Sequence, residues 1–131
     1  MKEESDNQVS LETAYKNAAD LLKKNEFNLA EKQLSEILKK FPNDPNALRL
    51  SGVSSLEQEK PEVALIPLQK AIRVAPKFLQ AHENLAQAWT QLGDLNKAEV
   101  CFKKCLELLK NQKSLKKRSP NLMRIWQLLV G

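Results

Sequence analysis

The side chains best suited to chemistry in this sequence are two cysteines and one histidine. Cys101 and Cys105 are four residues apart, which places them on one helix face with nearly parallel backbone directions, a geometry that suits a disulfide poorly. A zinc site would need further cysteine or histidine ligands, and His82 is the only histidine. We therefore expect both cysteines to be small core residues in a reduced, intracellular setting.

Recognisable catalytic motifs are missing from the sequence. There is no glycine-rich phosphate loop, no G-x-S-x-G and no H-E-x-x-H motif. No acid or nucleophile accompanies His82 in a catalytic motif, so we expect this histidine to pack between helices. We predict that the chain is not an enzyme and needs no metal and no cofactor.

The net charge of +5 is unevenly distributed along the 131 residues. Residues 100–131 hold eight basic side chains and one acidic one, for a net charge of +7, while residues 1–99 carry −2. The basic run at 113–118, KSLKKR, has no interleaved aromatic residues, so we interpret it as a solvated linker and nucleic acid as an unlikely partner. The polar N-terminus and the lack of a long apolar run predict a cytoplasmic protein without membrane contact.

The elements that position these residues repeat every 34 residues and are all expected to be helices. Residues 1–10 are expected to be a flexible lead-in, with Ser10 capping the first helix. Asn28 is expected to begin the second helix, with Glu31 in the capping-box position. Asp44 followed by Pro45 predicts the start of the third helix.

Two further residues predict local backbone features. Pro67 falls inside the fourth expected helix, where it removes one backbone hydrogen bond and favours a kink. Gly93 follows the fifth expected helix, as a left-handed C-terminal residue would. After the polar run, Ser119 and Pro120 predict the start of a last short helix.

Equivalent positions of the three units carry the same residue types. The shared types are a small residue in the first helix, an alanine early in the second helix, a bulky residue four places later and a closing proline. In the order of the repeats, they are Ala18, Gly52 and Ala86; Ala30, Ala64 and Ala98; Leu34, Leu68 and Phe102; and Pro42 and Pro76, with Lys110 departing from the pattern. Over residues 11–110 this pattern resembles the tetratricopeptide-repeat family.

The resemblance implies an all-α fold, a right-handed superhelical stack of three helix-turn-helix units with a C-terminal capping helix. The expected repeats are 11–44, 45–78 and 79–112, followed by the linker at 113–118 and the capping helix at 119–131. One hairpin cannot bury its own apolar face, so the units must stack and the last one needs a cover.

In this family the first helix of each repeat lines a concave groove, and the resemblance carries that groove onto fourteen positions here. They are Glu12, Tyr15, Ala19, Leu22, Asn46, Arg49, Leu50, Val53, Leu56, Gln80, Glu83, Asn84, Gln87 and Gln91. The apolar centre and the amide-rich end suit an extended peptide. The alternative is that these are ordinary solvated or inter-repeat positions.

One known use of such grooves is to hold the acidic C-terminus of a chaperone with a clamp of Lys, Asn and Arg. The matching positions here are Tyr15, Ala19, Leu50, Gln80 and Asn84. None of them is basic, so the charge-assisted bonds to a terminal carboxylate are missing. We therefore predict that the chain does not act as such a clamp.

The last expected helix is apolar on nearly all sides, although a cover needs only one apolar stripe. We therefore predict a second contact for it, with a second copy of the chain or a further domain, through Met123, Trp126 and Val130. The function that we predict is a protein-interaction scaffold that binds a peptide or protein segment. The alternative is the N-terminal repeat array of a larger bacterial enzyme, of a sulfotransferase or glycosyltransferase type, where it would position substrate or mediate dimerisation.

Overall fold

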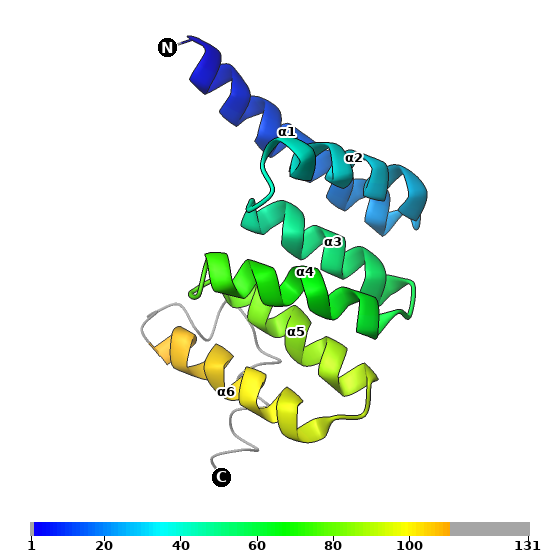
Figure 1. Ribbon diagram of the computed structural model, residues 1–131, viewed down its shortest axis with the longest axis vertical. Helices are drawn as coiled ribbons and strands as arrows, with labels where there is room; N and C mark the ends of the chain where they lie inside the picture. Colours follow the sequence, from blue (N-terminus) through cyan, green and yellow to red (C-terminus); the bar gives the residue numbers. More distant parts are fainter. Residues whose placement is uncertain (1, 111–131) are drawn as a thin grey trace.

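The computed structural model describes residues 2–110, and every regular element in that range is an α-helix. The helices are α1 (Lys2–Lys23), α2 (Phe27–Lys40), α3 (Pro45–Glu57), α4 (Pro61–Val74), α5 (Leu79–Gln91) and α6 (Leu95–Lys110). They form three helical hairpins that stack in chain order along the long axis (Figure 1). The first helices of neighbouring hairpins contact one another, α1 with α3 and α3 with α5. This arrangement confirms the predicted stack of three helical repeats.

The turn inside each hairpin has the same geometry three times. Asn25, Glu59 and Gly93 have φ values of 60°, 59° and 82° and are spaced 34 residues apart. In each turn the following residue donates its N–H five residues back, as Asp94 does to the Trp89 carbonyl at 2.9 Å. This is the Schellman ending of a helix. The predicted left-handed role of Gly93 is confirmed.

The helix starts agree with the sequence in one hairpin and differ in another. Asp44 caps α3, because its Oδ2 accepts the Ala47 N–H at 2.8 Å, as predicted. Asn28, however, lies inside α2, which begins at Phe27 after an N-cap, Glu26, that makes no side-chain hydrogen bond. Glu31 makes no capping box: its Oε1 accepts from Ser54 Oγ at 3.1 Å and Gln58 Nε2 at 2.8 Å on the neighbouring repeat.

The start of the first helix also differs from the prediction. Helix α1 begins at Lys2 rather than after Ser10, and its first turns project beyond α2 (Figure 1). The expected lead-in at 1–10 is thus helical from residue 2 onward. The segment contains Lys2, Glu3, Glu4 and Gln8, which favour helix, so a helix nucleated downstream can extend through Ser10.

The small residues of the first helices allow close packing within each repeat. Ala18 and Ala86 are fully buried, and a Cβ added at Gly52 would lie 2.5 Å from Leu68 Cγ. Leu68 is itself fully buried at the centre of the stack. The second repeat therefore has room for glycine alone at this position, because overpacking a dense core is unfavourable.

The described residues include only some of the remaining features predicted from the sequence. Pro67 lies inside α4, which is one helix from Pro61 to Val74. The basic linker at 113–118 and the capping helix at 119–131, with Met123, Trp126 and Val130, lie outside the described residues.

Candidate functional site

The predicted groove residues lie on α1, α3 and α5, which follow one another along the stack. Their exposure divides them into three groups. The exposed ones are Glu12, Asn46, Gln80, Gln87 and Gln91; the half-buried ones are Tyr15, Ala19, Arg49, Val53, Glu83 and Asn84; the buried ones are Leu22, Leu50 and Leu56. Eleven of the fourteen thus present surface to solvent, and three belong to the core.

One of the buried residues has no part in the groove. Leu56 is 3% exposed and packs with Ala64, Leu68 and Leu85 in the core between α3, α4 and α5. Its prediction as a groove residue is wrong, because its side chain is not accessible to a ligand. Leu22 and Leu50 are also nearly buried, but both still line a pocket between α1 and α3.

That pocket, which we call the groove pocket, has a volume of about 330 Å³ and brings together five predicted residues. Leu22 and Leu50 form its apolar lining with Ala19 and Val53, and Arg49 adds a charge. Lys23, Asn25 and Glu57 line it too, although they are not among the positions predicted from the sequence. A shift of Gln91 by 34 and 68 residues leads to Glu57 and Lys23, so the repeat itself could have revealed both.

Arg49, which lines the groove pocket, is held by contacts with α5 and with the residue before it. Its Nη1 donates to Asn84 Oδ1 at 3.3 Å, and its guanidinium lies 5.8 Å from the centre of the Phe78 ring. Its Nε is buried without a hydrogen-bond partner. Burial lowers the pKa of Arg49, and the charge of Glu83 counteracts that effect. Burial also raises the pKa of Glu83.

Tyr15 is held by a contact with a residue 29 positions away, which local sequence patterns do not predict. Its hydroxyl donates to Asp44 Oδ1 at 2.5 Å. Burial, followed by this hydrogen bond and the Asp44 charge, raises the pKa of Tyr15 to about 12. The hydroxyl is therefore committed within the protein, and the exposed part of the ring is what Tyr15 offers to a ligand.

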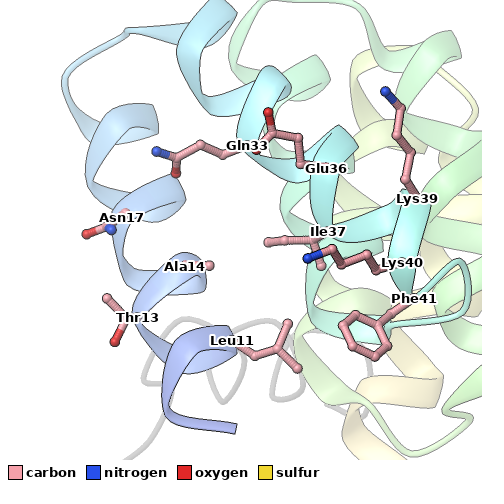
Figure 2. A pocket seen from close by; sticks show the side chains of 10 residues that line it. All are labelled: Leu11, Thr13, Ala14, Asn17, Gln33, Glu36, Ile37, Lys39, Lys40 and Phe41. Carbon is pink, nitrogen blue, oxygen red and sulfur yellow. The ribbon is translucent and has the colours of Figure 1, made fainter. Parts of the chain in front are cut away.

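A second and larger hollow, which we call the end pocket, opens between α1 and α2, with a volume of about 810 Å³. Figure 2 shows Leu11 and Ala14 on α1 facing Ile37 and Phe41 across it. Polar side chains complete its lining: Thr13, Asn17, Gln33, Glu36, Lys39 and Lys40. No predicted site residue lies in it. The sequence signal for this pocket is Ala14, because the corresponding positions of the other repeats hold the larger residues Leu48 and His82.

The cysteines and the histidine are core residues, as predicted. Cys101 is 8% exposed and Cys105 fully buried, and both are free thiols. Burial, the Glu83 charge and Cys101 raise the pKa of Cys105 to about 12. His82 is 6% exposed, and its Nε2 lies 2.8 Å from the Pro76 carbonyl oxygen, to which it donates. Residues 2–110 contain no group of three or more potential metal ligands.

Over the same residues, no helix has the length and apolar character that crossing a membrane requires.

Family comparisons identify the repeats over most of the chain. Residues 15–77 match one model described as tetratricopeptide repeat, and residues 79–112 match a second model with the same description. The two matches together extend from α1 to the end of α6.

Relatives of known identity have similar sequences over limited parts of their length. Human Superkiller complex protein 3 is 31% identical over 86 residues, 66% of this chain and 6% of that protein. Mouse tetratricopeptide repeat protein 5 is 28% identical over 118 residues, 88% of this chain and 26% of that protein. The chain thus spans a small share of the length of these relatives.

The fold is also found in solved structures. One is the Yersinia enterocolitica type III secretion chaperone SycD in complex with a peptide of the translocator YopD. It matches with a TM-score of 0.79 at 18% identity, covering 92% of each chain. At this identity the match shows a shared fold.

Proposed function

The chain belongs to the tetratricopeptide-repeat family, and from that premise we propose that it is a protein-interaction scaffold that binds an extended peptide segment along α1, α3 and α5. The observation that supports the proposal is the groove pocket between α1 and α3, which is lined by five residues predicted from sequence. An extended peptide leaves its main-chain groups free, so it needs donors and acceptors beside small apolar pockets.

The concave face supplies both kinds of contact. Ala19 and Val53 are half-buried over the apolar base formed by Leu22 and Leu50, a surface suited to one aliphatic side chain. Next to it, α5 presents amides at Gln80, Asn84, Gln87 and Gln91. Each amide can donate to a peptide carbonyl and accept from a peptide N–H.

Arg49 orients the peptide between these two regions. The residue is half-buried and lines the groove pocket. The accessible N–H groups of its guanidinium can donate to a peptide carbonyl that lies over the pocket. Glu83, whose charge acts on Arg49, offsets the cation, so the ligand class is an uncharged segment with an aliphatic residue rather than an acidic tail.

Peptide binding by a structural neighbour agrees with this assignment. The Yersinia chaperone has the same fold and is bound to a peptide of a partner protein. Its 18% identity gives no residue correspondence, so the groove residues of the present chain rest on their own geometry. The sequence-based alternative, an array preceding a catalytic domain, would instead have the repeats position substrate or mediate dimerisation.

The test is selection of binding peptides from a random library on the full chain, followed by calorimetry with variants. Val53→Glu places a charge in the groove pocket, while Val63→Glu places the same charge on α4, where Val63 is 52% exposed. We expect at least a tenfold loss of affinity for Val53→Glu and none for Val63→Glu. Equal affinities for all three proteins would contradict the proposal.

A further inference from the structure

The solvent-facing side of α4 carries an apolar side chain that nothing in the described residues covers. Of the large apolar side chains between residues 11 and 110, Ile66 is the most exposed, at 72%. Isoleucine is among the residues most often buried in folded proteins. α4 crosses the middle of the stack (Figure 1), yet neither neighbouring repeat covers Ile66.

Opposite charges lie on either side of Ile66 along the same row of α4. Glu62 precedes it by four residues and Lys70 follows it by four, a spacing that aligns the three side chains on one helix face. Arg73 adds a second base in the last turn. None of the ion pairs found in residues 2–110 involves Glu62, Lys70 or Arg73, so the acidic start and the basic end of the row are both available to a partner.

This row is complementary to itself when one copy is reversed. Rows of residues four apart interlock in the commonest class of helix packing. In an antiparallel pair of α4 helices centred on Ile66, Glu62 of each copy lies beside Lys70 of the other, with Arg73 one turn further on. A two-fold axis forms each of these contacts twice. A second copy of the chain therefore matches both the apolar centre and the charges.

The other repeats do not have this pattern. The residues that correspond to Glu62, Ile66 and Lys70 are Asn28, Lys32 and Glu36 in α2, and Asn96, Val100 and Lys104 in α6. The row of α2 thus has no apolar centre, and the row of α6 has no acidic start. The self-complementary arrangement belongs to α4 alone among the second helices of the three repeats.

We propose that the chain pairs with a second copy of itself through an antiparallel contact of α4 with α4, centred on Ile66, with Glu62 of each copy against Lys70 of the other. A contact between two single helices is small, so the dimer belongs to the weakly associating class. The residues of this contact do not line the groove pocket, so the pairing does not rest on the proposed peptide binding.

Sedimentation equilibrium on the full chain at low salt, from about 10 µM to about 1 mM, gives the first readout, because exposed ion pairs are least screened there. We expect the mass to rise from 14.9 kDa toward twice that value. Ile66→Asp should weaken the dimer by about tenfold or more, since it places a charge at the centre of the contact. Val100→Asp is the matched control, because Val100 is 68% exposed at the corresponding position of α6, and it should associate as the parent does. Circular dichroism checks that each variant is folded.

Charge reversal tests the register of the pairing. Glu62→Lys and Lys70→Glu should each weaken self-association, because each brings like charges together twice. In a one-to-one mixture of the two variants every contact again joins an acid to a base, so association should return to the strength of the parent. A parent that stays monomeric up to about 1 mM would overturn the proposal, as would an Ile66→Asp variant that associates like the parent or a mixture that associates no better than either variant alone.

Discussion

Tyr15 and Asp44 join the first repeat to the second through one carboxylate. Asp44 Oδ1 accepts the Tyr15 hydroxyl of α1 at 2.5 Å, while its Oδ2 accepts the Ala47 N–H at the start of α3 at 2.8 Å. The residue that caps α3, the first helix of the second repeat, thus also fixes the aromatic ring of Tyr15 on α1. Both oxygens are used, so the local cap and the tertiary contact do not compete.

The ionisation of Tyr15 provides a direct check of this contact. Tyr15 is the only tyrosine, so phenolate absorbance near 295 nm in the folded protein reports it alone. We expect a midpoint at about 12, compared with 10.0 for a free tyrosine. Asp44→Asn should lower the midpoint while retaining the cap, since asparagine also caps helices. A parent midpoint near 10 would disprove the contact.

The same pKa difference sets the sign of a pH effect on stability. The folded protein holds the Tyr15 proton to higher pH than the unfolded chain does, so between about pH 10 and 12 the folded state binds more protons. Stability contributed by Tyr15 is therefore present below pH 10 and lost as pH rises through this window. Urea denaturation of the parent and of Tyr15→Phe should show a smaller decline with pH for the variant. Identical declines would exclude Tyr15 as a cause.

Glu59 has the left-handed conformation that Gly93 has in the third repeat. That conformation costs a residue with a Cβ about 1–2 kcal/mol, of which the greater freedom of unfolded glycine offsets part. Glu59 is exposed, so we expect Glu59→Gly to raise the free energy of unfolding by roughly 0.5–1 kcal/mol. Asn25→Gly is the control and should gain less, since asparagine tolerates the conformation better. A loss of stability for Glu59→Gly in denaturant titration would refute the argument.

Gly52 is the tightest point of the core. We expect Gly52→Ala to lower the free energy of unfolding by roughly 1–2 kcal/mol, because the clash with Leu68 outweighs the better helix propensity of alanine. Leu68→Val in the same chain removes part of the obstructing side chain and should cost less in the Gly52→Ala background than in the parent. Additive effects of the two substitutions in urea titrations would show that the residues do not touch.

Burial should make both cysteines unreactive in the folded protein. Burial raises the pKa of each thiol, that of Cys105 to about 12, and the thiolate is the reactive form. We expect Ellman's reagent at pH 8 to titrate both thiols only after denaturant is added. Rapid reaction of Cys105 without denaturant would contradict its placement in the core.

The repeat could be predicted from sequence because its determinants are local. The Asp44 cap, the Gly93 turn and the small residues at 34-residue spacing act within one hairpin, and the structure confirms them. Glu31 also matched a local pattern, the capping box, but Ser54 and Gln58 of the next repeat compete for its carboxylate. Ser10 resembled a cap because local sequence cannot show that a helix continues through it.

The site was harder to predict because a repeat pattern shows on which face of a helix a residue lies, but not how deeply its side chain is buried. The family positions placed Leu56 in the groove, yet packing against Leu68 and Leu85 buries it. Lys23 and Glu57 occupy the positions of the first and second repeats that correspond to Gln91, but the prediction did not include them. The end pocket arises where a stack terminates, from the small Ala14 and the absence of a preceding helix in the described range, which no single-repeat pattern reveals.

Peptide binding along the concave face is the central claim, and calorimetry with a library-selected peptide tests it most directly. Val53→Glu should weaken binding at least tenfold, Arg49→Ala should weaken it less, and Val63→Glu on α4 should bind as the parent does. Unchanged affinity for Val53→Glu and Arg49→Ala, with both variants folded, would contradict the claim and place the peptide elsewhere on the chain.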